Sequence, residues 1–337
     1  MAALHYADAM QDPIAADAAG EFETEVSPPL RATITAADVG ERLDKVLARL
    51  FPQFSRSRLK AWCEAGHVRL DGQAAVVRSK PRCGSVVELQ LPPDPEAAAF
   101  AAQAIELPLV WSDAELAVID KPAGLVVHPA AGNWSGTLLN GLLWHFPETA
   151  ALPRAGIVHR LDKDTSGLMV VAKTREVMDA LVRAIAAREV SRQYLALAHG
   201  TWVGARHRTV DAPIGRDPRN RLRMAVVDLA SQSGKTARTD FELLASDVQS
   251  CFVRCVLHTG RTHQIRVHME SIGHPLIADS VYGGTPQYGM ERQALHATRL
   301  AFVHPASGMP VSWEAPLPHD MQGGLAHFGP ALQSSAA

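Results

Sequence analysis

The sequence predicts an α+β protein in which a small α/β module precedes a larger domain, built on a mixed, mostly antiparallel β-sheet with flanking helices. Three observations indicate this fold class. The chain has 337 residues, more than one average domain, and its 47% hydrophobic and 20% charged residues are typical of globular folds. Helical periodicity and turn-bounded strands fill residues 31–92. From residue 107 onward, predicted strands and helices alternate without a regular βαβ period.

The first module, residues 31–92, begins with two helices. Apolar residues recur at helical spacing over Arg42–Phe51 and stop at Pro52, which cannot continue a helix. A second helix is predicted over Ser57–Glu64, with its apolar side chains facing inward. Two strands are expected after it, at residues 67–72, ending in an Asp-Gly turn, and at residues 85–92.

Charge is distributed unevenly along the chain, although the net charge is only −2. Residues 1–30 hold six acidic and no basic side chains, which predicts a disordered acidic tail. Residues 31–92 hold eleven basic and six acidic side chains. Arg56, Arg58 and Lys60 fall on the outer face of the second helix. Because clustered Lys and Arg side chains neutralise phosphates, this module is predicted to bind RNA.

The larger domain is predicted over residues 107–321, after a Pro- and Ala-rich linker at 93–106 and before a short C-terminal tail at 322–337. Its strands are expected at Leu116–Asp120, Gly124–His128, Leu168–Ala172, Tyr194–Ala198 and Phe252–Leu257, and its helices at Val177–Ala187 and His263–Ile272.

The segment AGIVHRLDKDTSGLMVVAKT, residues 155–174, is the strongest candidate for a reactive loop. A stretch dense in charged and hydrogen-bonding groups, centred on Asp162, lies between an apolar approach and an apolar strand. Most polar loops are simply solvated, but a rigid scaffold presents reactive side chains in this way.

Two other segments carry candidate site residues. In residues 257–279 a glycine turn precedes a helix, and Arg261 and Arg266 lie around its first turn. A helix N-terminus with arginines favours an anion, either a phosphate or a protein carboxylate. Tyr194 begins a strand behind a basic stretch, a position where tyrosine is usually a core or interface residue.

The sequence favours neither a metal nor a membrane. Cys251 and Cys255 lie in a strand-like segment without a CxxC pair, so they are interpreted as structural cysteines. No apolar stretch approaches the length needed to cross a bilayer, and residues 1–30 lack the features of a signal peptide. We therefore expect a cytoplasmic protein.

The motifs resemble two known families. Residues 40–84 resemble the S4 RNA-binding domain, because the spacing between FSRSRL and the Asp71-Gly72 turn is kept. GIVHRLDKDTSGL, SRQY and TGRTHQIRVH, with KPAGLVVHPAAGN before them, resemble the active-site motifs of the RluA-type pseudouridine synthases. The resemblance covers roughly residues 31–321. It implies an isomerase, an intramolecular transferase that converts uridine in large-subunit ribosomal RNA to pseudouridine, without a cofactor or a metal.

The resemblance also implies roles for individual residues. Asp162 is the carboxylate that acts at C1′, and Arg266 pairs with it. Tyr194 stacks on the base and relays the C5 proton. The base must be flipped out of folded RNA, and Arg160 is expected to fill its vacated place. The remaining expected residues are His159 as a loop-shaping residue, Leu257 and Ile265 as pocket walls, Arg261 as a further basic contact, and Arg216, Arg219, Arg221 and Arg223 as phosphate contacts.

Two alternatives remain open at this point. The same chemistry could act on transfer RNA or on other ribosomal uridines, since specificity lies in RNA shape. A non-catalytic S4 assembly factor would fit the basic module alone, but the intact Asp162, Tyr194 and Arg266 disfavour it. We expect a monomer without a membrane partner. The sequence leaves open which uridines are modified, what the acidic tail does, and whether Asp162 attacks C1′ or only stabilises charge there.

Overall fold

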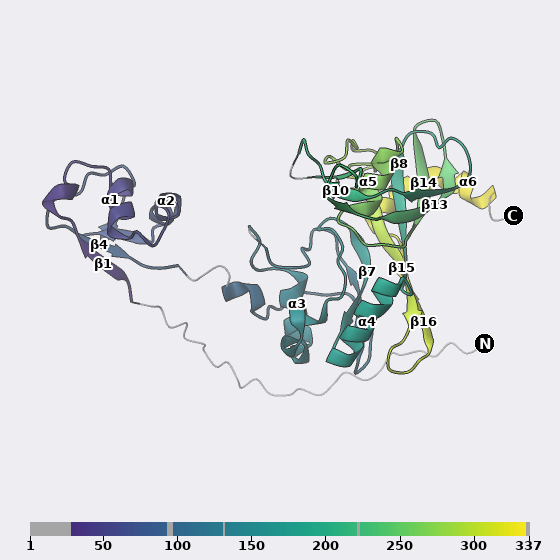
Figure 1. Ribbon diagram of the computed structural model, residues 1–337, viewed down its shortest axis with the longest axis horizontal. Coiled ribbons are helices and arrows are strands. Elements are labelled where there is room, and N and C mark those ends of the chain that lie inside the picture. Colours follow the sequence, from purple (N-terminus) through teal and green to yellow (C-terminus); the bar gives the residue numbers. More distant parts are fainter. Residues whose placement is uncertain (1–27, 93–96, 131, 221–222, 335–337) are drawn as a thin grey trace. The chain divides into compact units, whose positions relative to one another are not determined.

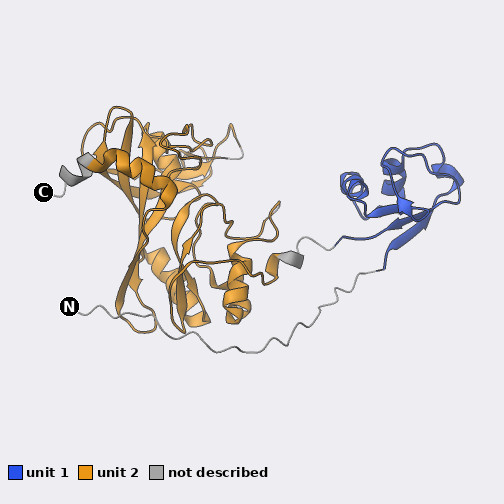
Figure 2. Ribbon diagram, turned by 180° about the vertical axis from the view of Figure 1, so that it is seen from behind, with its two compact units in different colours: residues 1–94 blue, residues 95–337 orange. Residues whose placement is uncertain are grey.

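The computed structural model describes residues 28–92, 97–130, 132–220 and 223–334 (Figure 1). The chain divides into two compact units, residues 1–94 and 95–337 (Figure 2). The division falls inside the segment predicted as the linker. Most of the predicted acidic tail, residues 1–27, lies outside the described residues. No helix in the described part of the chain is long and apolar enough to span a membrane.

The first unit is a four-stranded antiparallel sheet in the order β1-β4-β2-β3, with two helices packed on it. Its elements are β1 Leu30–Thr33, the 3-10 helix η1 Ala36–Asp38, α1 Leu43–Leu50, α2 Arg56–Glu64, β2 Val68–Leu70, β3 Gln73–Ala74 and β4 Val86–Leu89. The apolar stripe of α1, including Leu43 and Leu47, is fully buried against Leu59 of α2 and Leu89 of β4. The helices and strands predicted for this module are confirmed to within a few residues.

The second unit is built on a nine-stranded sheet in the order β5-β6-β7-β15-β8-β14-β13-β9, with β16 paired to β15. Its strands are β5 Leu109–Ser112, β6 Leu116–Lys121, β7 Ser166–Ala172, β8 Ser191–His199, β9 His207–Asp211, β13 Arg238–Ser246, β14 Ser250–Leu257, β15 Leu295–Val303 and β16 Pro310–Glu314. A smaller sheet contains β10 Ile214–Arg216, β11 Met224–Val226 and β12 Gly234–Lys235. The helices are η2 Ala97–Phe100, α3 Leu138–His145, η3 Pro147–Ala151, η4 Pro153–Gly156, α4 Arg175–Ala187, α5 Gln264–Ser271 and α6 His319–Ser334.

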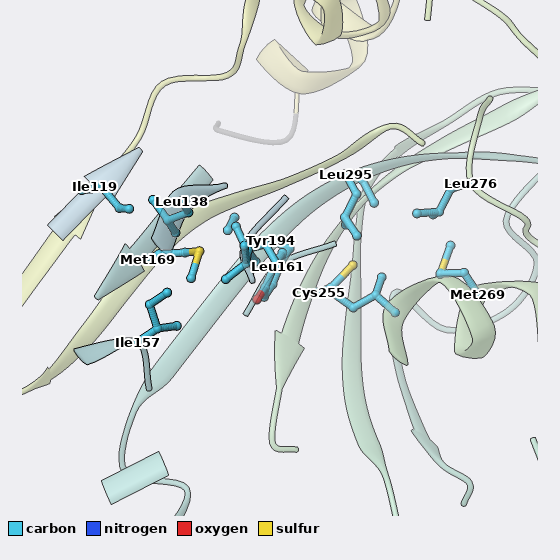
Figure 3. Close-up of a cluster of buried hydrophobic side chains, with 14 of the residues drawn as sticks. Ile119, Leu138, Ile157, Leu161, Met169, Tyr194, Cys255, Met269, Leu276 and Leu295 are labelled. Atoms are coloured by element: carbon cyan, nitrogen blue, oxygen red, sulfur yellow. The ribbon is translucent and has the colours of Figure 1, made fainter. Parts of the chain in front are cut away.

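All seven residues of strand β7 are buried. Because successive side chains point to opposite sides of a sheet, both faces of this strand are covered. Met169 belongs to a core cluster with Leu138 of α3, which Figure 3 shows in part. Val170 belongs to a second cluster with Leu181 of α4. The continuous apolar run that predicted this strand therefore reflects helices covering both of its faces. The predicted mixed, mostly antiparallel sheet with flanking helices is confirmed.

The two halves of the large sheet meet where β7 and β15 pair in parallel. Gly167 lies opposite Ala297 at this junction and has a φ of 115°. A Cβ atom on Gly167 would lie 2.3 Å from the carbonyl oxygen of Ala297. Only glycine fits such a close backbone approach.

Three predicted boundaries are wrong. Gly124–His128 is not a strand, because the carbonyl oxygens of Val126 and Val127 accept hydrogen bonds from the first N–H groups of α3 instead of pairing with a strand. Residues 99–106 are not linker, because Asn140 of α3 donates to the carbonyls of Ala99 and Ala101 at 3.3 and 2.8 Å. The C-terminal tail is largely helix α6.

Helix α6 packs on the sheet through Met321 and Phe328, both buried. The ring of Phe328 stacks on that of Phe252 of β14, with centroids 6.4 Å apart. The segment predicted as a tail therefore contains a helix with one apolar face, which packs in a core cluster.

We expect Gly167→Ala to lower the free energy of unfolding by more than about 3 kcal/mol, because the methyl group must push the two central strands apart. Gly204→Ala is the matched control, since Gly204 also has a positive φ, +100°, but nothing lies within 4 Å of its added Cβ. Its cost is that of the backbone conformation, about 1 kcal/mol. Urea unfolding of both variants measures the difference, and equal losses would contradict the close approach at Gly167.

Candidate active site

The loop between η4 and β7 carries Asp162 and is held by its backbone carbonyls. Lys121, at the end of β6, is completely buried. Its Nζ donates to the carbonyls of Lys163, Leu125 and Pro122 at 2.9, 2.9 and 2.7 Å. Burial lowers the pKa of Lys121 to about 8, against the attraction of Asp164. The lysine thus fixes the main chain one residue beyond Asp162.

Arg292, just before β15, holds the same loop from the other side. Its Nη1 donates to the carbonyl of Asp164 at 2.9 Å, and its Nη2 donates to the hydroxyl of Ser166 at 3.2 Å. Asp320 of α6 accepts two hydrogen bonds from this guanidinium at 2.6 and 2.9 Å. Two cations, one at the end of β6 and one in the segment before β15, therefore fix the loop that presents Asp162.

The carboxylate of Asp162 forms the ion pair with Arg266 that the sequence predicts. Nη1 of Arg266 lies 3.0 Å from Oδ2 of Asp162. Nε and Nη2 of the same arginine donate to both oxygens of Asp279 at 2.7 and 2.9 Å. Burial opposes the charge of Arg266, but the hydrogen bonds of Asp279 and Asp162 outweigh it and raise the pKa of the arginine. One guanidinium thus bridges two carboxylates.

The bend before α5 brings further groups to Asp162. His263, the residue before the helix, has a left-handed φ of 55°. Its Nε2 lies 4.0 Å from Oδ1 of Asp162, and its Nδ1 lies 2.9 Å from the hydroxyl of Tyr282. The guanidinium of Arg266 lies 5.0 Å from the centroid of the Tyr282 ring. Burial lowers the pKa of His263, so this ring is neutral at pH 7.

Tyr194 lies on β8 within the cluster of Figure 3, where it is labelled next to Leu161. Only 5% of its surface is exposed, and burial raises its pKa to about 12. The phenol is therefore uncharged at neutral pH, and its ring offers a flat apolar face beside Asp162.

Asp162, Tyr194, His263 and Arg266 line a cavity of about 670 Å³. Its wall contains eight residues predicted from the sequence, namely His159, Arg160, Asp162, Tyr194, Leu257, Arg261, Ile265 and Arg266. The predicted walls Leu257 and Ile265 thus do line it. Among the described residues of the wall, Asp162 is the only carboxylate, and several others are arginines. The volume is in the range of pockets for small organic groups.

His159 lies in this wall but is tied to the scaffold. Its Nε2 accepts the backbone N–H of Val170 at 3.1 Å. Burial, and then the charge of Arg192, lower its pKa to about 3. A neutral ring that bonds to the middle of β7 fits the loop-shaping role better than an acid–base role.

The other predicted basic residues lie outside this cavity. Arg223 is held by Asp217 at 3.2 Å and by Glu270 at 3.3 Å. Arg216 and Arg219 are exposed and do not line the cavity. Arg221 lies outside the described residues. Arg56, Arg58 and Lys60 belong to the first unit.

Sequence reasoning missed four residues that shape the site: Lys121, Asp279, His263 and Arg292. Asp279 stands at the end of the segment 257–279, where a buried acid after an apolar pair was an available signal. Lys121 and His263 stand in the motifs KPAGLVVHPAAGN and TGRTHQIRVH, which were an available signal. Arg292 had no such signal, and its partner Asp164 lies far away in the sequence. Within the described ranges no cluster of three or more His, Cys, Asp or Glu side chains is placed to hold a metal. Cys251 and Cys255 are buried in β14.

Comparison with known proteins defines the class of this enzyme. Residues 115–271 match the family of RNA pseudouridylate synthases, and residues 41–75 match the S4 domain. The chain belongs to the RNA pseudouridylate synthase family and is an RNA-modifying isomerase.

Individual relatives are similar over most of their length. Ribosomal large subunit pseudouridine synthase D of Nitrosomonas europaea is 48% identical over 90% of this chain and 88% of the relative. The protein of the same name from Pseudomonas aeruginosa is 50% identical over 83% of this chain and 90% of the relative. Human RNA pseudouridylate synthase domain containing 1 is similar in structure, with a TM-score of 0.50 at 26% identity over 69% of this chain and 96% of its own.

We expect Asp279→Asn to lower both stability and turnover, because it leaves Arg266 buried with half of its compensating charge. Breaking a buried pair from one side costs about 3 kcal/mol or more. Asp179→Asn is the matched control, since Asp179 also binds an arginine, Arg175, through two hydrogen bonds but both side chains are exposed, by 60% for Arg175 and 46% for Asp179. Its cost should be below about 1 kcal/mol. Urea unfolding and single-turnover rates measure both, and equal losses in the two variants would contradict the role of burial.

Proposed function

We propose that this protein isomerises uridines in large-subunit ribosomal RNA. Two relatives that are 48–50% identical to this chain, with 88–90% of their own length aligned to it, are named as ribosomal large subunit pseudouridine synthases, which supports this substrate. The basic S4 unit supports an RNA target of this kind. We propose further that the protein acts as a monomer. A cytoplasmic location goes with this substrate.

The observation that carries the proposal is the ion pair between Asp162 and Arg266 in the wall of the cavity. A carboxylate held in a fixed position beside a flat apolar ring suits a reaction at a sugar carbon. The reaction breaks the N1–C1′ bond and forms a C5–C1′ bond, while C5 loses a proton and N1 gains one. Asp162 supplies negative charge at C1′, either by attack or by electrostatic stabilisation.

Tyr194 and Arg160 complete the proposed mechanism. A flipped base can stack on the Tyr194 ring, which is neutral because burial raises its pKa to about 12. With such a pKa the phenol oxygen accepts the C5 proton only as it passes its own proton on. Arg160 is exposed at the wall of the cavity, where it can enter the place that the base leaves.

The S4 unit supplies phosphate contacts, but its cations are not equivalent. Arg56 binds the buried carboxylate of Asp44 through Nε at 3.2 Å and Nη2 at 2.5 Å. Arg58 lies over the ring of Trp62, and Lys60 faces Glu64 at 3.7 Å. Arg58 and Lys60 remain exposed for RNA, whereas Arg56 is committed to the fold. Further exposed cations of this unit are Arg69, Arg78, Lys80 and Arg82.

We expect Asp162→Asn to lower the rate of pseudouridine formation at least about a hundredfold while RNA affinity changes little. The substitution removes the charge at nearly constant shape. Tritium release from ribosomal RNA labelled at uridine C5 measures the rate, and filter binding measures the affinity. Asp179→Asn is the control, because Asp179 forms an exposed pair with Arg175 on α4. A rate of Asp162→Asn above a few per cent of wild type would overturn the assignment.

The S4 prediction separates binding from folding. Replacing both Arg58 and Lys60 by Gln should weaken RNA binding and lower the slope of log affinity against log salt by about 1.4–1.8, since each lost phosphate contact removes about 0.7–0.9. Arg56→Gln should instead destabilise the first unit with a smaller change in slope, because it leaves the buried carboxylate of Asp44 with one of its two arginine partners, Arg42. Salt titrations of RNA binding and urea unfolding test the contrast. Identical slopes for wild type and the double variant would exclude the helix face as a phosphate contact.

A further inference from the structure

Arg192 is a buried arginine whose side chain has no partner. Only 6% of its surface is exposed. Its Nε is buried without a hydrogen-bond partner, and its side chain forms no hydrogen bond or ion pair with any residue that the structure describes. Arg266, the other buried arginine of the cavity wall, is bound by two carboxylates. Arg160 and Arg188, also in the wall, are exposed to water. Arg192 is therefore largely shielded from water and lacks a counter-charge among the described residues.

The guanidinium of Arg192 lies at the reactive part of the cavity. Arg192 precedes Tyr194 by two residues on β8, so both side chains leave the strand on the same face. Both line the cavity. The charge of Arg192 acts on Tyr194 and on His159, because it opposes the rise in the pKa of the phenol and lowers the pKa of the imidazole.

The loop before α5 is shaped around this guanidinium. A Cβ atom on Gly260 would lie 3.0 Å from Nη1 of Arg192. Gly260 has no left-handed φ, so its backbone does not itself require glycine. Its lack of a side chain leaves room for the arginine. The neighbouring Arg261 differs, because its Nε donates to the carbonyl of Thr236 at 3.0 Å.

The positive charge of the Arg192 guanidinium indicates what kind of ligand would compensate it. A buried, unpaired guanidinium is unfavourable, and a neutral acceptor such as a uracil carbonyl does not compensate a full charge. Asp162, the only carboxylate that the described part of the chain places in the cavity wall, is already bound to Arg266. A phosphodiester supplies an anion with two oxygens that match the guanidinium fork.

We propose that Arg192 binds a backbone phosphate adjoining the uridine that enters the cavity. This inference rests on the proposed function in that the ligand is RNA. It makes Arg192 a positioning residue, which holds the nucleotide by its phosphate while the base lies at Tyr194 and the sugar at Asp162. The charge left unpaired in the free protein is then neutralised only when substrate is bound.

The decisive experiment measures the binding of uridine, uridine 3′-monophosphate and uridine 5′-monophosphate by isothermal titration calorimetry at low ionic strength. Wild type should bind one of the monophosphates at least about tenfold tighter than uridine, as expected for a charge-assisted bidentate contact. Arg192→Met should bind all three alike and keep the wild-type affinity for uridine. Arg192→Lys should recover part of the preference. Gly260→Ala should weaken the preference by displacing the guanidinium, and Arg175→Met, an exposed arginine on α4, should leave it unchanged.

The thermal midpoint of the free protein separates this role from a structural one. Arg192→Met should raise the midpoint, because it removes an uncompensated buried charge, whereas Arg266→Met should lower it. The inference is overturned if wild type shows no preference for a phosphate, if Arg192→Met keeps that preference, or if Arg192→Met loses stability and affinity for uridine together. Nucleotide binding requires neither turnover nor ribosomal RNA. A wild-type protein that prefers a monophosphate but releases no tritium from ribosomal RNA would therefore reject the proposed function and leave this inference standing.

Discussion

The guanidinium of Arg266, shared between Asp162 and Asp279, is the interaction on which the site depends. It is buried from water, and each of its hydrogen bonds to the two acids is 3.0 Å or shorter. Asp279 is almost fully buried and neutralises the arginine from behind, while Asp162 remains partly open to the cavity. The arrangement lets a carboxylate face an apolar ring without being free to rotate away. A single Asp–Arg pair would fix charge but not direction, because one of the two groups could still swing.

This network requires a rigid loop, and the sheet provides it. β7 and β15 are brought into parallel contact at Gly167, and the loop before β7 is pinned at Lys163 and Asp164 by cations on the two adjoining segments. Those cations, Lys121 and Arg292, bind main-chain oxygens of the loop, and Arg292 also binds the Ser166 hydroxyl and the Asp320 carboxylate. The position of the reactive acid is therefore set by backbone hydrogen bonds, which do not depend on the side chains of the loop itself.

The sequence predicts the parts of this structure that local patterns encode. The helix α1 and the strand β7 follow from periodicity and apolar runs, and the motifs around Asp162 and Arg266 follow from resemblance. Sequence patterns fail where the conformation is decided by a partner that they do not predict. Residues 124–128 read as a strand, yet their carbonyls bind the start of α3, a helix that no pattern predicted although Leu138 lies only twelve positions beyond Val126. The same reason hides the ligand of Lys121, which lies 42 residues away in the reactive loop.

The cations of this protein fall into two groups. In one group the positive charge is compensated by protein oxygens and stabilises the fold, and in the other it is available to bind RNA. Arg56, Lys121 and Arg266 are held by protein oxygens, so replacing them should be felt in stability first. Arg58 is exposed and Arg192 is buried without a partner, so their charge is available to an anion from outside. An exposed cation costs the fold little, but a buried unpaired one is unfavourable until substrate arrives. Stability lost in the free protein in this way becomes affinity and orientation in the complex, because the phosphate neutralises a charge that no described protein group compensates.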